Sequence, residues 1–343
     1  MACVGIIANP ASGRDIRRLV TGASVFGNAD KAGMVMRLLV GLGACGVPRV
    51  LLMPAADGLS AALERQLWSH SRNGASHTLP DLEVLPIRLT GTARDTTMAV
   101  AQMREAGAKA LVVLGGDGTH RVVAKTCGNV PICALSTGTN NAFPEMREAT
   151  IAGMATALAI GGRGGPRAYR RTVKLTVHRG GGAADDLALV DVALTSDRFV
   201  GARALWHPES VSELVAATCN PAAIGLSAVA GLLAPDRQTE GHGLHVRFAS
   251  HPAQARTVLQ VPLAPGLVAP VAISEFRELE LGDTVALRGG GGVLALDGER
   301  EIELGRDESA TVRLTTGPTR IDIDEVMRHA AAERATWLQP EGS

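Results

Sequence analysis

The chain has 343 residues, of which 46% are hydrophobic and 20% are charged, so it is expected to fold into a globular protein of two domains. Its 34 basic and 34 acidic side chains cancel, which excludes an overall electrostatic field that would gather nucleic acid or acidic lipid headgroups.

The five cysteines argue against a disulfide framework and a structural zinc site, because their number is odd and none forms a C-x-x-C pair. The longest apolar run, near residues 222–234, is broken by glycine and serine, and the N-terminus lacks the basic region of a signal peptide. We therefore expect a cytoplasmic protein without a membrane-spanning or export segment.

The first part of the chain predicts a doubly wound α/β domain. Short β-type runs alternate with helix-type segments up to about residue 160. Runs such as Ala110 to Leu114 are apolar throughout, as in parallel strands that helices cover on both faces. Thr92 or Asp95 is expected to begin one of the helices.

A domain boundary is predicted at residues 161–167, where four glycines and a proline favour a linker or sharp turn. We assign residues 1–163 to the first domain. We assign residues 164–321 to a β-rich substrate domain, because apolar and polar residues alternate as in half-buried antiparallel strands. One helix is expected at Pro208 to Ala217. A last helix, Asp324 to Trp337, should pack back on the first domain, to which residues 322–343 then belong.

The strongest functional pattern is a glycine-rich loop between an apolar strand and a helix-type segment: Gly115, Gly116, Asp117, Gly118 and Thr119. In the predicted parallel sheet this loop lies at the C-terminal edge of the strands. The backbone amides at a helix N-terminus there can bind phosphate, and glycines let the backbone approach the phosphate closely. The carboxylate would repel a phosphate charge ~4 Å away by about 4 kcal/mol at an effective dielectric of ~20. A bridging Mg²⁺ ion, or a substrate hydroxyl that gives up its proton, would relieve this repulsion in a phosphoryl transfer. The alternative is a tight turn in which the aspartate binds its own backbone.

Two further loops of the first domain are candidates for nucleotide binding. Thr139, Asn140 and Asn141 follow the next strand and are expected at the same sheet edge as the glycine loop. Their side chains suit a ribose or adenine edge, with a simple helix N-cap as the equal alternative. The weaker candidate is the first strand-to-helix junction, where Ser12 and Gly13 would contact phosphate.

Asp297, Gly298 and Glu299 follow an alternating strand of the second half. Acids flanking a glycine are most typical of a hairpin turn, and a role in chemistry is the alternative. His120, directly after the glycine loop, would either help neutralise a phosphate or simply occupy the first turn of a helix.

Four motifs in this order resemble the NAD kinase and diacylglycerol kinase superfamily: NPASG, GGDGT, STGTNNAF and LDGE. TGTARDT and NPAAIGLSAVAG look most like the ATP-NAD kinase branch that includes AcoX, which is associated with acetoin catabolism. The resemblance covers essentially the whole chain. It implies a Rossmann-like first domain, a β-sandwich-like second domain and a nucleotide site between them.

The same resemblance implies roles for individual residues. The backbone of the glycine loop would meet phosphates, Asp117 would assist catalysis, and Asn140 and Asn141 would help to bind the nucleotide. Asp297 and Glu299 match the D-G-E of bacterial lipid kinases, in which the glutamate is the proposed base. NAD kinases usually show a G-S-T-A-Y-type loop and an N-E dipeptide, where this chain has IGLSAVAG and VDVA.

The sequence thus predicts a kinase that transfers phosphate from ATP or polyphosphate, with Mg²⁺, to a soluble hydroxyl acceptor, with NAD the first candidate. Asp117 and Glu299 are the catalytic candidates, and Asp117 and Asp297 the metal ligands. The expected nucleotide-binding residues are Asn9, Ser12, Gly13, Gly115, Gly116, Gly118, Thr119, Thr139, Asn140 and Asn141. Two alternatives stay open: a diacylglycerol-type lipid kinase, and a non-catalytic NAD(H)- or ATP-binding accessory protein of a catabolic operon. The oligomeric state, including a homo-oligomer, is also open.

Overall fold

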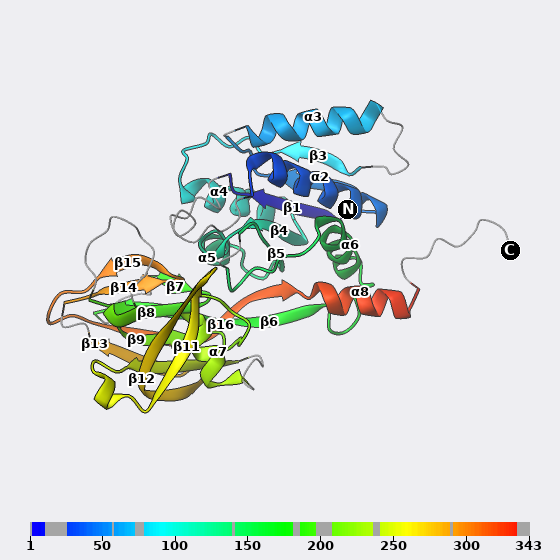
Figure 1. Cartoon of the computed structure of the whole chain (residues 1–343). Coiled ribbons are helices and arrows are strands. Elements are labelled where there is room, and N and C mark those ends of the chain that lie inside the picture. The colour runs from blue at the N-terminus through cyan, green and yellow to red at the C-terminus, as the bar shows by residue number, and fades with distance from the viewer. Residues whose placement is uncertain are drawn as a thin grey trace.

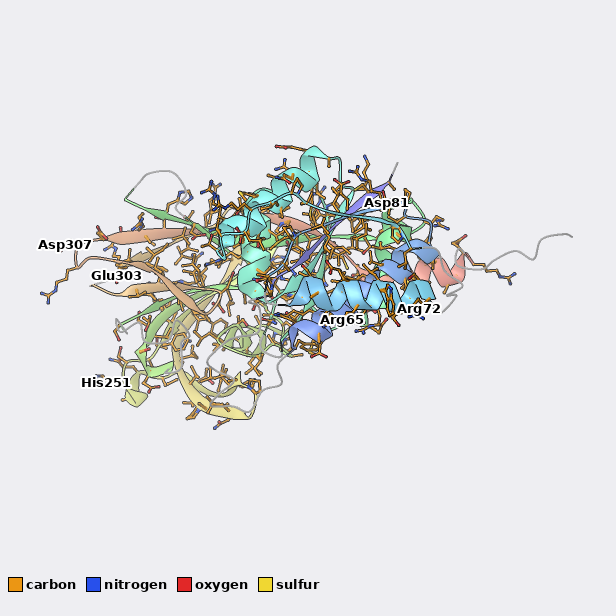
Figure 2. The ribbon with its side chains drawn as sticks, turned by 90° about the horizontal axis from the view of Figure 1, so that it is seen from above. Arg65, Arg72, Asp81, His251, Glu303 and Asp307 are labelled. Carbon is orange, nitrogen blue, oxygen red and sulfur yellow. The ribbon has the colours of Figure 1, made fainter. Side chains whose placement is uncertain are left out.

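The computed structural model describes residues 2–10, 26–56, 58–72, 79–138, 141–180, 186–196, 208–235, 241–288 and 291–334. Within these ranges the chain forms a nine-stranded and a seven-stranded sheet, with helices around the first part of the larger one (Figure 1). Seen from above, Arg65, Arg72 and Asp81 mark the α/β part, and His251, Glu303 and Asp307 mark the β-rich part (Figure 2).

The first part alternates strands and helices, as predicted. Strands β1, β2, β3, β4 and β5 pair in parallel in the order β3-β2-β1-β4-β5. One apolar core lies between this sheet and helices α2 and α6, and a second lies between the other face and helices α4 and α5. The elements are β1 (Cys3–Ala8), α2 (Asn28–Ala44), β2 (Arg49–Leu52), α3 (Leu59–Arg72), β3 (Asp81–Val84), α4 (Ala93–Glu105), β4 (Ala110–Gly115), α5 (Asp117–Thr126), β5 (Ile132–Ser136) and α6 (Ala149–Ile160).

The second part is a sandwich of two sheets, which confirms the predicted β-rich class. Its own sheet has the order β11-β12-β10-β9-β8-β14-β15, and its apolar face packs on β6, β13 and β16 of the larger sheet. The strands are β6 (Tyr169–Arg179), β7 (Asp186–Ala188), β8 (Asp191–Thr195), β9 (Val211–Ala216), β10 (His242–Phe248), β11 (Thr257–Ala264), β12 (Leu267–Glu280), β13 (Thr284–Arg288), β14 (Val293–Leu296), β15 (Glu299–Glu303) and β16 (Ser309–Ile321). Helix α7 (Ser227–Leu233) packs on β10 and β11.

The long strand β16 joins the two parts. Its first residues pair antiparallel with β6 and β13, and its last residues reach β5, where Arg320 lies beside Ile132 in parallel. The chain then enters helix α8 (Ile323–Ala332), which packs on α6 (Figure 1). The predicted return of the C-terminal helix to the first part is therefore confirmed.

The helix predicted at Pro208 to Ala217 is wrong. The structure has one short 3₁₀ turn, Pro208–Ser210, followed by strand β9. This strand lies between β8 and β10, and Leu214 and Val215 are fully buried on its two faces. Long-range pairing and burial on both faces thus override the weak local helix signal.

Among the helices of the described residues, none combines the length and the apolar character that a membrane span requires.

The close packing of α2 on α6 depends on two glycines. A methyl group at Gly41 would overlap the carbonyl oxygen of Thr150, and one at Gly153 would lie 2.6 Å from the carbonyl oxygen of Leu38. Backbone atoms cannot rotate away, so we expect Gly41→Ala to lower the free energy of unfolding by about 1–3 kcal/mol in urea denaturation.

Gly33 provides a control on the same helix. There a methyl group would meet only the ends of the flexible Arg37 and Gln66 side chains, at 3.4 and 3.8 Å. Because alanine is the better helix former, Gly33→Ala should leave stability unchanged or raise it by up to about 1 kcal/mol. Equal stability of the Gly41 and Gly33 variants would contradict the packing argument.

Candidate active site

The glycine loop forms the junction between β4 and α5. Gly116 is the N-cap of α5 and has no side chain with which to cap the helix. A methyl group at Gly115 would lie 2.6 Å from Cβ of Thr119, and one at Gly116 would lie 2.9 Å from Oδ1 of Asn141. The two glycines are therefore required for close packing of the loop, and the positive end of the helix dipole points toward it.

The Asp117 side chain reaches across to the loop that follows β5. Its carboxylate oxygens accept hydrogen bonds from the backbone amides of Ala142, at 3.1 and 3.2 Å, and of Phe143, at 2.8 Å. These partners are 25 and 26 residues away along the chain, which excludes the tight turn in which the aspartate binds only its own backbone. The carboxylate is thus fixed between the ends of two neighbouring parallel strands.

Asn141 connects the same two loops from the opposite direction. Its Oδ1 accepts a long hydrogen bond, 3.4 Å, from the amide of Asp117, and its Nδ2 donates to Oγ of Ser136 at 2.8 Å and to the carbonyl of Gly138 at 3.2 Å. The expectation that both loops meet at one sheet edge is confirmed for Asn141. Thr139 and Asn140 lie outside the described residues.

The first strand-to-helix junction also reaches the glycine loop. Nδ2 of Asn9 donates to Oγ1 of Thr119 at 3.0 Å. Lys31 of α2, which is 1% exposed, donates from Nζ to the carbonyl oxygens of Asn9 and Pro10, both at 3.0 Å. The sequence reasoning missed Lys31, although it is one of only four lysines in the chain. Ser12 and Gly13 lie outside the described residues.

His120 is a structural neighbour of the loop and does not carry the positive charge that one interpretation of the sequence gave it. Its ring is fully buried, with Nδ1 2.9 Å from the carbonyl oxygen of Gly116 and the ring centroid 5.6 Å from that of Phe143. Burial lowers the pKa of His120 to about 4, so the imidazole is neutral near pH 7.

Asp297 lies in the tight turn between β14 and β15, so the predicted hairpin is confirmed. Asp297 and Gly298 both have positive φ angles, 52° and 78°, as in a type I′ turn. The Asp297 carboxylate accepts hydrogen bonds from the amides of Leu189, at 2.9 Å, and Val190, at 2.8 Å. Glu299 is the first residue of β15, opposite Leu296, and its side chain is outside the described part of the structure.

Asp297 is buried, with 8% of the residue exposed, and its pKa responds to the charge of Asp117. Burial raises the pKa of Asp297 to about 8, the charges of Asp117 and Asp191 add to this rise, and Arg121 acts in the opposite direction. The charges of two of the predicted acids, one from the α/β part and one from the sandwich, are therefore coupled.

The donor chemistry of these acids fits Mg²⁺ carried by a nucleotide. In the described part of the chain, no group of three or more His, Cys, Asp or Glu side chains could hold a metal ion by itself. Mg²⁺ in phosphoryl-transfer sites usually takes one or two carboxylates together with substrate phosphates, and so needs no such cage. Metal binding by Asp117 and Asp297 remains a prediction.

Comparisons with known proteins relate both halves of the chain to described families. Residues 4–163 match the ATP-NAD kinase N-terminal domain, and residues 173–317 match the acetoin catabolism protein X C-terminal domain. Acetoin catabolism protein X of Cupriavidus necator is 44% identical in an alignment of 343 positions, which covers 98% of this chain and 95% of that protein.

Among solved structures, a diacylglycerol kinase from Bacillus anthracis str. Sterne is 12% identical, with a TM-score of 0.45, and the match covers 93% of this chain and 96% of that one. A second structure from the same organism is 11% identical, with a TM-score of 0.49 and coverage of 93% and 94%. On the sequence identity over nearly its full length, the chain belongs to the family of acetoin catabolism protein X, with an N-terminal domain of the ATP-NAD kinase type.

Proposed function

We propose that the protein is an ATP- and Mg²⁺-dependent phosphotransferase that acts on a soluble hydroxyl compound, with NAD as the first candidate acceptor. The observation that carries this proposal is the fixed Asp117 carboxylate, which lies at the start of α5 and within electrostatic reach of Asp297. A carboxylate beside a helix N-terminus suits a reaction in which a phosphate and a hydroxyl group meet.

In the proposed reaction, the hydroxyl oxygen of the acceptor forms a bond to the terminal phosphorus, and the bond from that phosphorus to the bridging oxygen of the nucleoside diphosphate breaks. The hydroxyl proton passes to the Asp117 carboxylate and later to solvent. The amides of Gly116 and Gly118 would bind the oxygens of the transferred group. Mg²⁺ would be held by the phosphates and by Asp297 once this carboxyl has lost its proton, and would supply charge neutralisation; binding of the ion by Asp117 is the alternative to its role as base.

Other predicted residues have supporting or competing roles in this proposal. Asn9 and Asn141 would hold the glycine loop and its neighbouring loops in position to bind the nucleotide, since both form hydrogen bonds with residues of α5. Glu299 is the competing base, because it follows the hairpin turn that holds Asp297. Polyphosphate is the competing phosphoryl donor.

A transfer assay with several acceptors tests the proposal. The purified protein is incubated with Mg²⁺ and either ATP or polyphosphate, and with NAD, NADH, small alcohols related to acetoin, or diacylglycerol in vesicles. We expect a product heavier by one phosphate with a soluble acceptor. Transfer to diacylglycerol alone would instead support a lipid kinase. Nucleotide binding without any product would support a non-catalytic accessory protein.

A further inference from the structure

The loop between β5 and α6 supplies the two amides that hold Asp117, and a residue from the far end of the chain contacts this loop. Arg320 lies near the end of β16, where it is paired with Ile132 of β5 on one side and Arg170 of β6 on the other. The backbone of Arg320 is therefore fixed by the same sheet whose edge carries the site.

The Arg320 guanidinium contacts the loop at two points. Its central carbon lies 5.1 Å from the ring centroid of Phe143, and Nη2 lies 2.7 Å from Oε1 of Glu145. The Arg320 side chain is 15% exposed and Phe143 is 6% exposed. A cation over an aromatic face gains strength when it is shielded from water in this way.

The two residues that Arg320 contacts are themselves fixed. The Glu145 backbone is bonded to β5, through its carbonyl to the amide of Ser136 at 2.8 Å and through its amide to the carbonyl of Ala134 at 3.2 Å. The Phe143 ring also packs on the buried His120. Phe143 thus lies between His120 of α5 and Arg320 of β16, and its own amide points to Asp117.

We infer that Arg320 is a positioning residue of the site, which fixes Phe143 and thereby keeps the Ala142 and Phe143 amides on the Asp117 carboxylate. The catalytic part of this inference rests on the proposed function, whereas the structural part does not. Arginine suits the position because its planar group can cover a ring and bind a carboxylate at the same time, which a lysine ammonium cannot do equally well.

Arg147 offers a matched control in the same loop. It forms ion pairs with Glu145 at 3.1 Å and with Asp324 of α8 at 2.5 Å, and its side chain is 38% exposed. Replacing Arg147 by methionine likewise removes an arginine that pairs with Glu145, but leaves the Arg320–Phe143 contact in place.

Amide hydrogen exchange, followed by NMR in the protein without ligands, tests the structural part. In Arg320→Met we expect the amides of Ala142 and Phe143 to exchange about tenfold faster or more, because their bonds to Asp117 open more often. Arg320→Lys should recover part of this protection, and Arg147→Met should retain nearly all of it.

The catalytic part has a separate measurement. With the acceptor found in the transfer assay, Arg320→Met should lower kcat by about tenfold or more, with less than about a twofold change in KM for the nucleotide, since the glycine loop is untouched. Should Arg320→Met fail to fold, Glu145→Gln, which weakens the same ion pair without loss of volume, takes its place.

Unchanged exchange of the two amides in Arg320→Met, or equal acceleration in Arg147→Met, would overturn the inference. The exchange experiment needs no acceptor, so it gives its result even when the transfer assay yields no product. Faster exchange without any phosphoryl transfer would uphold the positioning role and contradict only the proposed function.

Discussion

Asp117→Asn is expected to lower kcat for phosphoryl transfer by about 10²–10⁴-fold, with a much smaller effect on nucleotide affinity. The asparagine cannot accept the proton of the acceptor hydroxyl, and it lacks the negative charge that orients this group. Its Oδ1 can still accept the hydrogen bond that the Phe143 amide donates to the aspartate. The glycine loop should therefore keep its shape and its phosphate-binding amides.

Steady-state kinetics and calorimetric titration with the nucleotide measure these two quantities separately. Asp95→Asn is the matched control, because Asp95 is also an aspartate in the first turn of a helix and accepts amide hydrogen bonds, at 2.8–3.0 Å, from Thr90 and Gly91. This control should lose stability without losing kcat. A wild-type kcat in Asp117→Asn would remove Asp117 from the proposed mechanism.

The proximity of the glycine loop to the loop after β5 could be predicted from the sequence, because it follows from the order of strands and helices along the chain. A fully apolar run such as Ala110 to Leu114 indicates a buried parallel strand, and parallel neighbours bring their following loops to one edge. The hydrogen bonds of Asp117 to Ala142 and Phe143 are the direct consequence. Thr92 likewise caps α4, as its position before a periodic segment indicates.

Contacts between distant segments could not be predicted in this way. Arg320 and Phe143 are separated by 177 positions, and an arginine in a strand carries no local sign of the ring that it will cover. The same holds for Asp297. From a turn more than 100 positions further along the chain, its carboxylate accepts hydrogen bonds from the amides of residues 189–191. Its turn was predictable from D-G, whereas its proximity to Asp117 depends on how the sandwich packs on the first part.

The free energy of unfolding is expected to fall as pH rises from 6.5 to 8, because of Asp297. Its pKa is raised from 3.8 to about 8 in the native state, chiefly by burial and then by the charges of Asp117 and Asp191. Between these two values the native carboxyl holds a proton that the unfolded chain has lost. Unfolding therefore releases a proton, and stability decreases with pH, by about 1.5 kcal/mol over this interval.

The interval is chosen because His120 has the opposite effect below it. Since the pKa of His120 is lowered from 6.5 to about 4, its contribution to stability is lost as pH falls from 6.5 toward 4, where it offsets the gain from Asp297. Above pH 6.5 the effect of His120 fades, because the unfolded imidazole also loses its proton, so the difference in slope between the wild type and Asp297→Asn reports on Asp297.

Urea denaturation at several pH values between 6.5 and 8, with EDTA to exclude metal ions, measures this slope in the wild type and in Asp297→Asn. The asparagine does not titrate, and its Oδ1 can still accept hydrogen bonds from the Leu189 and Val190 amides, so the part of the slope that Asp297 causes should disappear even if overall stability changes. Parallel slopes in the two proteins would mean that Asp297 is already ionised in the native state. The three backbone amides would then outweigh burial and the neighbouring acids, and the proximity of Asp117 would no longer affect the charge at this position.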